Sequence, residues 1–296
     1  MLRIMLHPEE KLQKMPRKPP VAKLKQRPEQ IINPRQRLLS KNNINPHFHI
    51  PYYKIGDYLN FFKEHLLNLE IYFPSNSLDI INDADIKRLQ EKLDYQPAIT
   101  IHAPFMDLSP GAVDSKVRAV TIERFSQIFN IAETLKPKVI VFHSGYEKWK
   151  YASKIDLWLE GSLITWKHFL PRAEEQGIRI AIENIFENDP INLRFLMEKM
   201  ESQYFGVCFD TGHFNLFSAT PLEEWLQQLK PYIIELHLHD NNKSADNHRA
   251  IGDGSFDFDT LFPLLKDRNL VYTIEAHTKE DAFKSLERLK TYSLSA

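Results

Sequence analysis

The stretch VIVFHSGYEKWKYASKIDLWLEGSLITWKHFLPRAEEQGIRIAIE, residues 139–183, decides the fold. It begins and ends with short apolar runs, Val139–His143 and Arg179–Glu183, which are rich in β-branched residues and typical of buried strands. Between them, Ile155–Gln176 has the length and apolar spacing of a helix. A strand, a helix and a second strand in this order predict a unit with two parallel strands.

The same alternation continues on both sides of this stretch. Further strand candidates are Ile44–Tyr52, Leu67–Phe73, Ala98–His102, Phe205–Asp210, Ile233–His237 and Val271–Glu275. Further helix candidates are Ile55–Leu66, Asp83–Leu93, Ser115–Leu135, Asn192–Met200, Leu222–Leu229, Thr260–Asp267 and Asp281–Leu294. Eight strands alternating with eight helices predict an α/β fold, a single (β/α)8 TIM barrel. An open doubly wound sheet is the alternative, but the chain has no GxGxxG or GxxxxGK[ST] loop for a nucleotide.

Composition narrows the class of protein. The 296 residues are 43% hydrophobic and 26% charged, which is ordinary for a globular chain with a sizeable core. No apolar stretch approaches the roughly 18 to 20 residues of a membrane span, so we expect no membrane partner. A single cysteine, Cys208, excludes an internal disulfide and fits a reducing, cytoplasmic setting. With twelve histidines beside it, a metal site would use nitrogen and oxygen ligands.

Charge divides the chain into two parts. Up to Lys41 the net charge is +8, and the remainder carries −9. The basic part also holds six prolines and has no sustained apolar period. We therefore expect residues 1–43 to be a basic, disordered extension and residues 44–296 to be the barrel domain.

Six consecutive strand candidates end on a side chain that can bind a metal. These are His102, His143, Glu183, Asp210, His237 and Glu275. The carboxyl ends of barrel strands meet at one mouth, where active sites form. His213 in DTGH, and Asp246 with His248 in DNH, add three more candidates in loops. Imidazole and carboxylate ligands without thiolate suit zinc, manganese or a related divalent ion.

These motifs resemble one known superfamily. HAPF (102–105), FHSGY (142–146), IEN (182–184), DTGH (210–213), HLHD (237–240), DNHRAIGDG (246–254) and the IE ending at residue 275 are similar to the xylose-isomerase-like barrels. The resemblance covers roughly residues 44–295 and implies a metal-dependent TIM barrel. Its branches include sugar-phosphate isomerases and epimerases, and the type-2 apurinic/apyrimidinic endonucleases typified by endonuclease IV.

The isomerase-like branch implies one divalent ion on Glu183, Asp210, His237 and Glu275. Glu183 and Glu275 would be the catalytic residues, each moving a proton on one face of a metal-chelated carbohydrate. The resemblance also implies substrate contacts from His213 and from a basic residue soon after His237, for which Lys243 is the candidate.

The endonuclease-like branch implies three zinc ions and hydrolysis of a phosphate ester in nucleic acid. His102, His143 and Glu183 would hold the first ion. Glu183 would bridge to a second ion, which Asp210, His237 and Glu275 also bind. The third ion would lie on His213, Asp246 and His248. All these residue types are present, so one to three ions remain possible.

Loop content favours the sugar reaction. The segment YFPSNSLDI, residues 72–80, is short and lacks Arg and Lys, and no long loop rich in Arg and aromatic residues is available to open a duplex. FHSGY also departs from the endonuclease-like HPG, and HLHD places His239 where the endonucleases have Asn. We therefore favour a small carbohydrate as substrate, with nucleic acid only under the endonuclease alternative. A third hypothesis is a non-catalytic metal-binding barrel whose basic extension recruits a partner.

Four further expectations concern residues near the strand ends and inside the barrel. His49, at the end of the first strand, could line the substrate pocket. Asn184 would orient Glu183 or bind a substrate hydroxyl. His239 falls off the metal-facing side, so it would lie behind the ligands or be exposed. Deeper in the barrel, Arg179 and Glu235 would form a buried ion pair.

Overall fold

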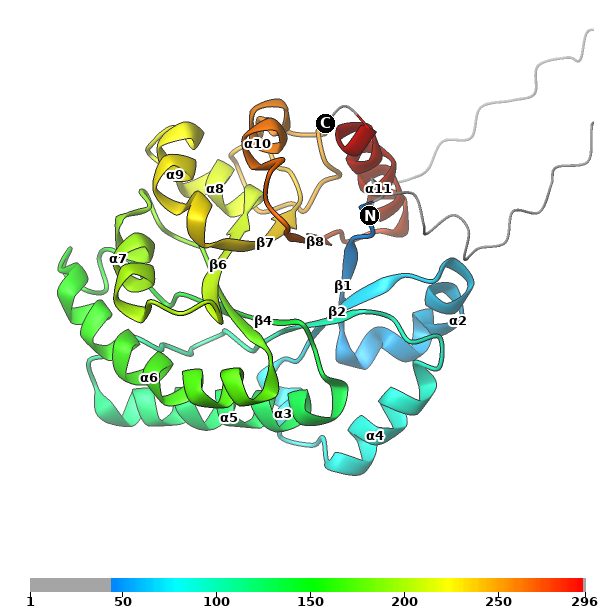
Figure 1. Cartoon of the computed structure of the whole chain (residues 1–296), viewed down its shortest axis with the longest axis horizontal. Helices are drawn as coiled ribbons and strands as arrows, with labels where there is room; N and C mark the ends of the chain where they lie inside the picture. The colour runs from blue at the N-terminus through cyan, green and yellow to red at the C-terminus, as the bar shows by residue number, and fades with distance from the viewer. Residues whose placement is uncertain (1–43, 295–296) are drawn as a thin grey trace, which may run out of the picture. The chain divides into compact units, whose positions relative to one another are not determined.

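The apolar runs pair with one another in sequence order and close into a barrel of eight parallel strands (Figure 1). The computed structural model describes residues 44–294. The strands are β1 (His47–Pro51), β2 (Asn68–Tyr72), β3 (Ile99–His102), β4 (Val139–His143), β5 (Arg179–Glu183), β6 (Phe205–Asp210), β7 (Ile233–Leu238) and β8 (Val271–Ile274). β8 pairs with β1 and closes the ring, which confirms the predicted (β/α)8 TIM barrel. The predicted basic extension, residues 1–43, lies outside the described residues.

Helices cover the outside of the barrel (Figure 1). They are α2 (Ile55–His65), α3 (Ser75–Leu78), α4 (Asp83–Lys92), α5 (Ser115–Leu135), α6 (Ile155–Gln176), α7 (Ile191–Met200), α8 (Thr211–Phe217), α9 (Leu222–Leu229), α10 (Phe258–Leu265) and α11 (Lys279–Leu294), with 3-10 turns η1 (Tyr52–Lys54) and η2 (Lys230–Tyr232). Their apolar faces and the outer faces of the strands share one large hydrophobic core. Within the described residues, no helix is both long and apolar enough to span a membrane.

The short helices α3 and α8 are absent from the sequence-based expectation. The DTGH segment was expected as a turn after a strand, but Asp210 ends β6 and its side chain accepts a hydrogen bond from the His213 backbone N–H at 2.6 Å, which caps α8. The sharp turn from strand to helix brings His213 back over the end of its own strand.

The inside of the barrel is apolar on one side and polar on the other. Val139, Val141, Ala181, Cys208 and Ile234 form a separate small core there. The polar side holds Glu70, Thr100, Glu235 and Thr273, which are all fully buried. Strand alternation therefore places this layer directly beneath the strand ends.

The predicted ion pair between Arg179 and Glu235 is wrong. No ion pair between them lies within 4 Å, and Glu235 instead accepts a hydrogen bond at 2.7 Å from Thr273 Oγ1. Arg179 opens β5, whereas Glu235 pairs with Cys208, near the middle of β6. The shift in register between β6 and β7 at Val207 and Cys208 means that counting by two does not place the two side chains at one level.

Candidate functional site

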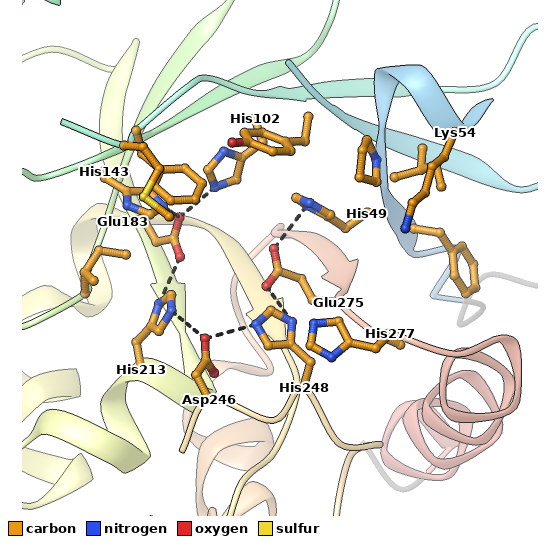
Figure 2. Close-up of a pocket in the computed structure, with 18 of the residues that line it drawn as sticks. His49, Lys54, His102, His143, Glu183, His213, Asp246, His248, Glu275 and His277 are labelled. Carbon is orange, nitrogen blue, oxygen red and sulfur yellow. Dashed lines mark hydrogen bonds and ion pairs between the residues drawn. The ribbon is translucent and has the colours of Figure 1, made fainter. Parts of the chain in front are cut away.

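A cavity of about 1120 Å³ opens at the carboxyl ends of the strands. Figure 2 shows the histidines and carboxylates that converge in it. Six strand-end side chains were predicted to meet there, and ion-pair distances connect all six in one cluster. The cluster contains three subgroups that share ligands.

The first subgroup is His102, His143 and Glu183, from the ends of β3, β4 and β5. Nε2 of His102 lies 3.1 Å from Glu183 Oε2, and Nε2 of His143 lies 3.4 Å from the same oxygen. Their ligand atoms all lie within 4.8 Å of one another. Glu183 is almost fully buried and His143 is partly exposed, so three donor atoms face one point at the wall of the cavity.

The second subgroup centres on His237, at the end of β7. Its Nδ1 faces three carboxylates: Glu275 Oε1 at 3.2 Å, Glu183 Oε1 at 3.6 Å and Asp210 Oδ2 at 3.8 Å. Burial raises the pKa of Glu183 and Glu275, but nearby histidines more than offset this and lower both pKa values well below the usual range. Both glutamates are therefore held as carboxylates across one imidazole.

The third subgroup brings His213, Asp246 and His248 together, although two of them come from a loop after β7. Asp246 Oδ2 lies 3.0 Å from His248 Nε2 and 3.4 Å from His213 Nε2. His213 Nδ1 also lies 3.1 Å from Glu183 Oε1, which connects this subgroup to the first. All nine residues that the sequence put forward as metal ligands therefore lie in one continuous cluster.

Glu70 belongs to this cluster and was missed. It lies in the middle of β2, is fully buried, and accepts hydrogen bonds from His49 Nδ1 at 2.9 Å and His237 Nε2 at 3.2 Å. Thr100 Oγ1 donates to it at 3.3 Å. Burial raises the pKa of Glu70, but His237 and His49 more than offset this and keep it ionised. The available signal was a lone charged residue inside the apolar run Leu67–Phe73.

His49 lines the cavity, as the sequence suggested. Its Nδ1 lies between Glu70 and Glu275, at 2.9 and 3.1 Å. Burial lowers its pKa, but these two carboxylates raise it to about 10 overall. His49 is thus a charged hydrogen-bond donor that lies between the carboxylates of Glu70 and Glu275.

Of the two positions expected for His239, the structure excludes exposure and places it against two of the predicted ligands. It is fully buried, and its Nε2 lies 3.0 Å from Asp210 Oδ2 and 3.7 Å from Glu275 Oε2. His239 lies two residues after His237, and side chains two apart face the same side of a strand, so His239 follows His237 into the cluster although β7 ends at Leu238. His239 stacks on His248, with ring centroids 4.1 Å apart, and His248 stacks on His277 at 4.7 Å.

Two predicted substrate contacts are not at the cavity. Lys243 lies beside Phe214 and Glu223 at a second, smaller cavity, because the loop after β7 turns away and gives Lys243 a positive φ of 66°. Asn184 uses both ends of its amide on the next strand: Nδ2 donates to the Asp210 carbonyl at 3.1 Å, and Oδ1 accepts from the Asp210 N–H at 2.9 Å. It therefore holds Asp210 in place and is not among the residues that line the large cavity.

The donor set fits a divalent cation. Nδ1 of His213, His237 and His239 is buried in each case and has no hydrogen-bond partner. Each of these nitrogens instead faces a carboxylate. Buried imidazole nitrogens facing ionised oxygens, with no thiolate in the cluster, suit zinc, manganese or a related ion.

Comparison with solved structures agrees with this architecture. A D-tagatose 3-epimerase-like protein is 28% identical, with a TM-score of 0.67 over 83% of this chain and 96% of that chain. The TTHB071 protein of Thermus thermophilus, soaked with zinc chloride, is 25% identical, with a TM-score of 0.72 over 86% of this chain and 99% of that chain. A D-psicose 3-epimerase from Clostridium cellulolyticum, at 13% identity and a TM-score of 0.68 over 84% of this chain and 98% of that chain, shows the fold alone.

Sequence comparison gives the family. The uncharacterised protein MJ1311 of Methanocaldococcus jannaschii is 35% identical over 226 residues, which cover 72% of this chain and 76% of the relative. The family model described as a xylose isomerase-like TIM barrel matches residues 68–292, which hold the cluster described above apart from His49. The chain therefore belongs to the xylose isomerase-like TIM-barrel family.

Proposed function

We propose that this protein is a divalent-metal-dependent isomerase or epimerase of a sugar or sugar phosphate. The observation that carries the proposal is the placement of Glu183 and Glu275, which lie on different strands and both face Nδ1 of His237. Both also line the large cavity. The similarity to a D-tagatose 3-epimerase-like protein supports the same class of reaction.

The two glutamates would transfer the proton. One carboxylate removes a proton from the carbon next to the substrate carbonyl, and the other returns a proton to the opposite face. Each oxygen must come within about 3 Å of the proton it moves. Their lowered pKa values mean that both groups are ionised, the state in which a carboxylate can accept a proton. His213 and His49, which line the same cavity, are placed to donate hydrogen bonds to substrate oxygens.

Glu183, Asp210, His237 and Glu275 would hold the catalytic cation. When bound there, a divalent ion polarises the substrate carbonyl and makes the neighbouring C–H more acidic. Asn184 fixes the backbone of Asp210, and Glu70 fixes the ring of His237. These two contacts keep the donor atoms in place while substrate enters and leaves.

A zinc-dependent phosphodiesterase is the second candidate. The observation in its favour is the third subgroup, His213, Asp246 and His248, which lies within ion-pair distance of the rest of the cluster. Elemental analysis of protein purified without a metal-chelating tag separates the two. We expect about one manganese, cobalt or magnesium ion per chain, whereas close to three zinc ions per chain favour the phosphodiesterase.

Proton exchange tests the roles of the glutamates. The full chain, loaded with metal, is incubated with ketoses and their phosphates in deuterium oxide, and label at the carbon next to the carbonyl is measured by NMR. We expect E183Q and E275Q each to reduce exchange at least about 100-fold, because the amide cannot act as a base. Glu147 lines the same cavity but makes no ion pair in the described part of the chain, so E147Q is the control and keeps its activity.

Metal content is measured for every variant, so that lost chemistry is separated from lost metal. Exchange that persists in both E183Q and E275Q, with wild-type metal content, refutes their roles as bases.

A further inference from the structure

The large cavity continues beyond the metal-binding cluster into a region that the proposed chemistry does not use. We call this region the lysine lobe and define it as Lys54, Tyr58, Phe61, Lys279 and Phe283, which all line the cavity. Lys54 ends η1 and precedes α2, while Lys279 begins α11. The lobe thus lies where the loops after β1 and β8 meet, next to each other in the closed barrel.

One lysine of the lobe lies against two aromatic rings. Lys279 Nζ is 4.8 Å from the centroid of Tyr58 and 5.0 Å from that of Phe61. Lys54 lines the same cavity from the end of η1, directly before the helix that carries both rings. Phe61 contacts Phe283 edge to face at 5.4 Å, which completes an aromatic wall behind the ammonium groups.

Neither lysine has a carboxylate partner. In the part of the chain that the structure describes, no ion pair within 4 Å involves Lys54 or Lys279, whereas Lys63, Lys230 and Lys284 each pair with an aspartate. Both side chains are exposed, so an anion that enters the cavity can reach two ammonium groups that no carboxylate of the described residues neutralises. The lobe therefore has positive charge that the protein itself does not neutralise.

The lobe is connected to the metal-binding cluster by a continuous wall. Residues 275–279 all line the cavity and run from Glu275 to Lys279. Figure 2 shows Lys54 on the same side of the cavity as His49, Glu275 and His277. A cavity of about 1120 Å³ lies just above the range of about 300 to 1,000 Å³ that is usual for drug-sized ligands, so a free monosaccharide fills only part of it.

We propose that the lysine lobe binds the phosphate of a phosphorylated sugar, while the carbonyl end of the same molecule lies at the metal-binding cluster. This rests on the proposed function and names its substrate class. A phosphate ester carries about −1.5 to −2 charges near neutral pH, which two ammonium groups match. The opposite side of the cavity is less suitable, because there Lys150 is accompanied by Asp107 and Glu147.

Binding of two probes tests the assignment without any turnover. Fructose 6-phosphate and fructose are titrated calorimetrically into the metal-loaded full chain. We expect the phosphorylated probe to bind at least about tenfold more tightly, the gain typical of charge-assisted contacts. The double variant K54Q/K279Q removes this preference, whereas K54R/K279R, which retains both charges, preserves it. K150Q removes one cation from the same cavity and serves as the matched control, with the preference retained.

Two results overturn the proposal. One is equal binding of the two probes by the wild type. The other is a preference that persists in K54Q/K279Q, since the phosphate then lies at the metal-binding cluster. A lysine-dependent preference without any proton exchange refutes the isomerase reaction but leaves the phosphate site standing. Proton exchange without a lysine-dependent preference refutes the phosphate site but leaves the isomerase reaction standing. The two proposals therefore fail separately.

Discussion

The carboxylate of Glu70 shows how one buried side chain sets the chemistry of its neighbours. A carboxylate can only accept, so Nε2 of His237 carries the hydrogen of the 3.2 Å contact. Once a cation displaces the proton on Nδ1, this atom would direct its lone pair at the point that Glu183, Asp210 and Glu275 also face. Glu70 thus selects the tautomer of His237 that a metal requires.

Replacing Glu70 by Gln tests this role. The amide has one acceptor oxygen for two imidazoles, so it cannot orient both His49 and His237. We expect E70Q to bind zinc or manganese about 10- to 100-fold more weakly, as is usual when a hydrogen-bond partner of a metal-binding histidine is removed. Competition with a fluorescent chelator measures this independently of activity. E147Q is the control, and unchanged affinity in a folded E70Q protein rules out the positioning role.

Residue-level prediction from sequence succeeded where strand alternation applies. His102, His143, Glu183 and Asp210 end strands, His237 lies one residue before the end of β7 and Glu275 directly follows β8, so their convergence followed from the barrel itself. Lys243 lies in the loop beyond β7, where the direction of a side chain depends on contacts that no periodicity records. Glu70 was missed because only residues at strand ends were considered.

At the scale of elements, the junction of β6, α8 and β7 builds one side of the site. Helix α8 begins directly after Asp210, and Thr211 Oγ1 donates to the carbonyl of His239 at 2.7 Å. The carbonyl of Gly212 accepts from Asn241 Nδ2 at 2.8 Å. The backbone of this short helix therefore lies directly against the imidazole of His239, and only glycine fits at residue 212.

A methyl group at residue 212 tests this packing. The Cβ that Gly212→Ala introduces overlaps the imidazole of His239, which contacts Asp210 and has no free space to move into. Overpacking of this kind costs about 1 to 3 kcal/mol. We expect a lower melting temperature and weaker metal binding together.

Gly56→Ala is the matched control, since an added Cβ in α2 meets nothing within 4 Å. It is expected to stabilise the helix by about 0.5 to 1 kcal/mol and to leave metal binding unchanged. Wild-type metal affinity in Gly212→Ala contradicts the packing argument.

The short elements were also the ones that sequence analysis missed. Helix α8 has seven residues and α3 has four, which is too short for an apolar period to develop. The long helices α5 and α6, with 21 and 22 residues, repeat their apolar pattern several times and were predicted with the bounds found in the structure. The long helices that pack on the strands can thus be predicted from sequence, whereas the short helix α8 that positions His213 cannot.

At the scale of the whole molecule, the barrel interior concentrates titratable groups that water does not reach. The polar side of the interior holds Glu70, Glu235 and His47, each at most 4% exposed. Burial, then the charge of Glu70, raises the pKa of Glu235 to about 8, while burial lowers the pKa of His47 to about 4. Folding therefore fixes protonation states that the unfolded chain does not have, so the stability of the whole barrel depends on pH.

The shifted pKa of His47 gives the direction in which stability changes with pH. Burial is the main cause of its lowered pKa, with a further contribution from the cation of Lys138, and Glu70 only partly opposes them. Between pH 6.5 and about 4 the unfolded chain binds a proton at His47 that the folded chain does not, so stability falls as the pH falls through this window. A pKa lowered from 6.5 to about 4 corresponds to about 3 kcal/mol of unfolding free energy.

Replacing His47 by Phe isolates this contribution from the other acidic and basic groups. The phenyl ring is similar in size and cannot titrate, so H47F retains the packing at the start of β1 and loses the proton linkage. Urea unfolding of both proteins in the presence of a chelator, at several pH values from about 4 to 7.5, gives the difference in free energy. We expect this difference to shift by about 3 kcal/mol in favour of H47F as the pH falls from about 7 to 4. If the unfolding free energies of the two proteins change with pH in parallel, His47 takes up its proton equally in the folded and unfolded chains. In that case its burial does not exclude the charged form.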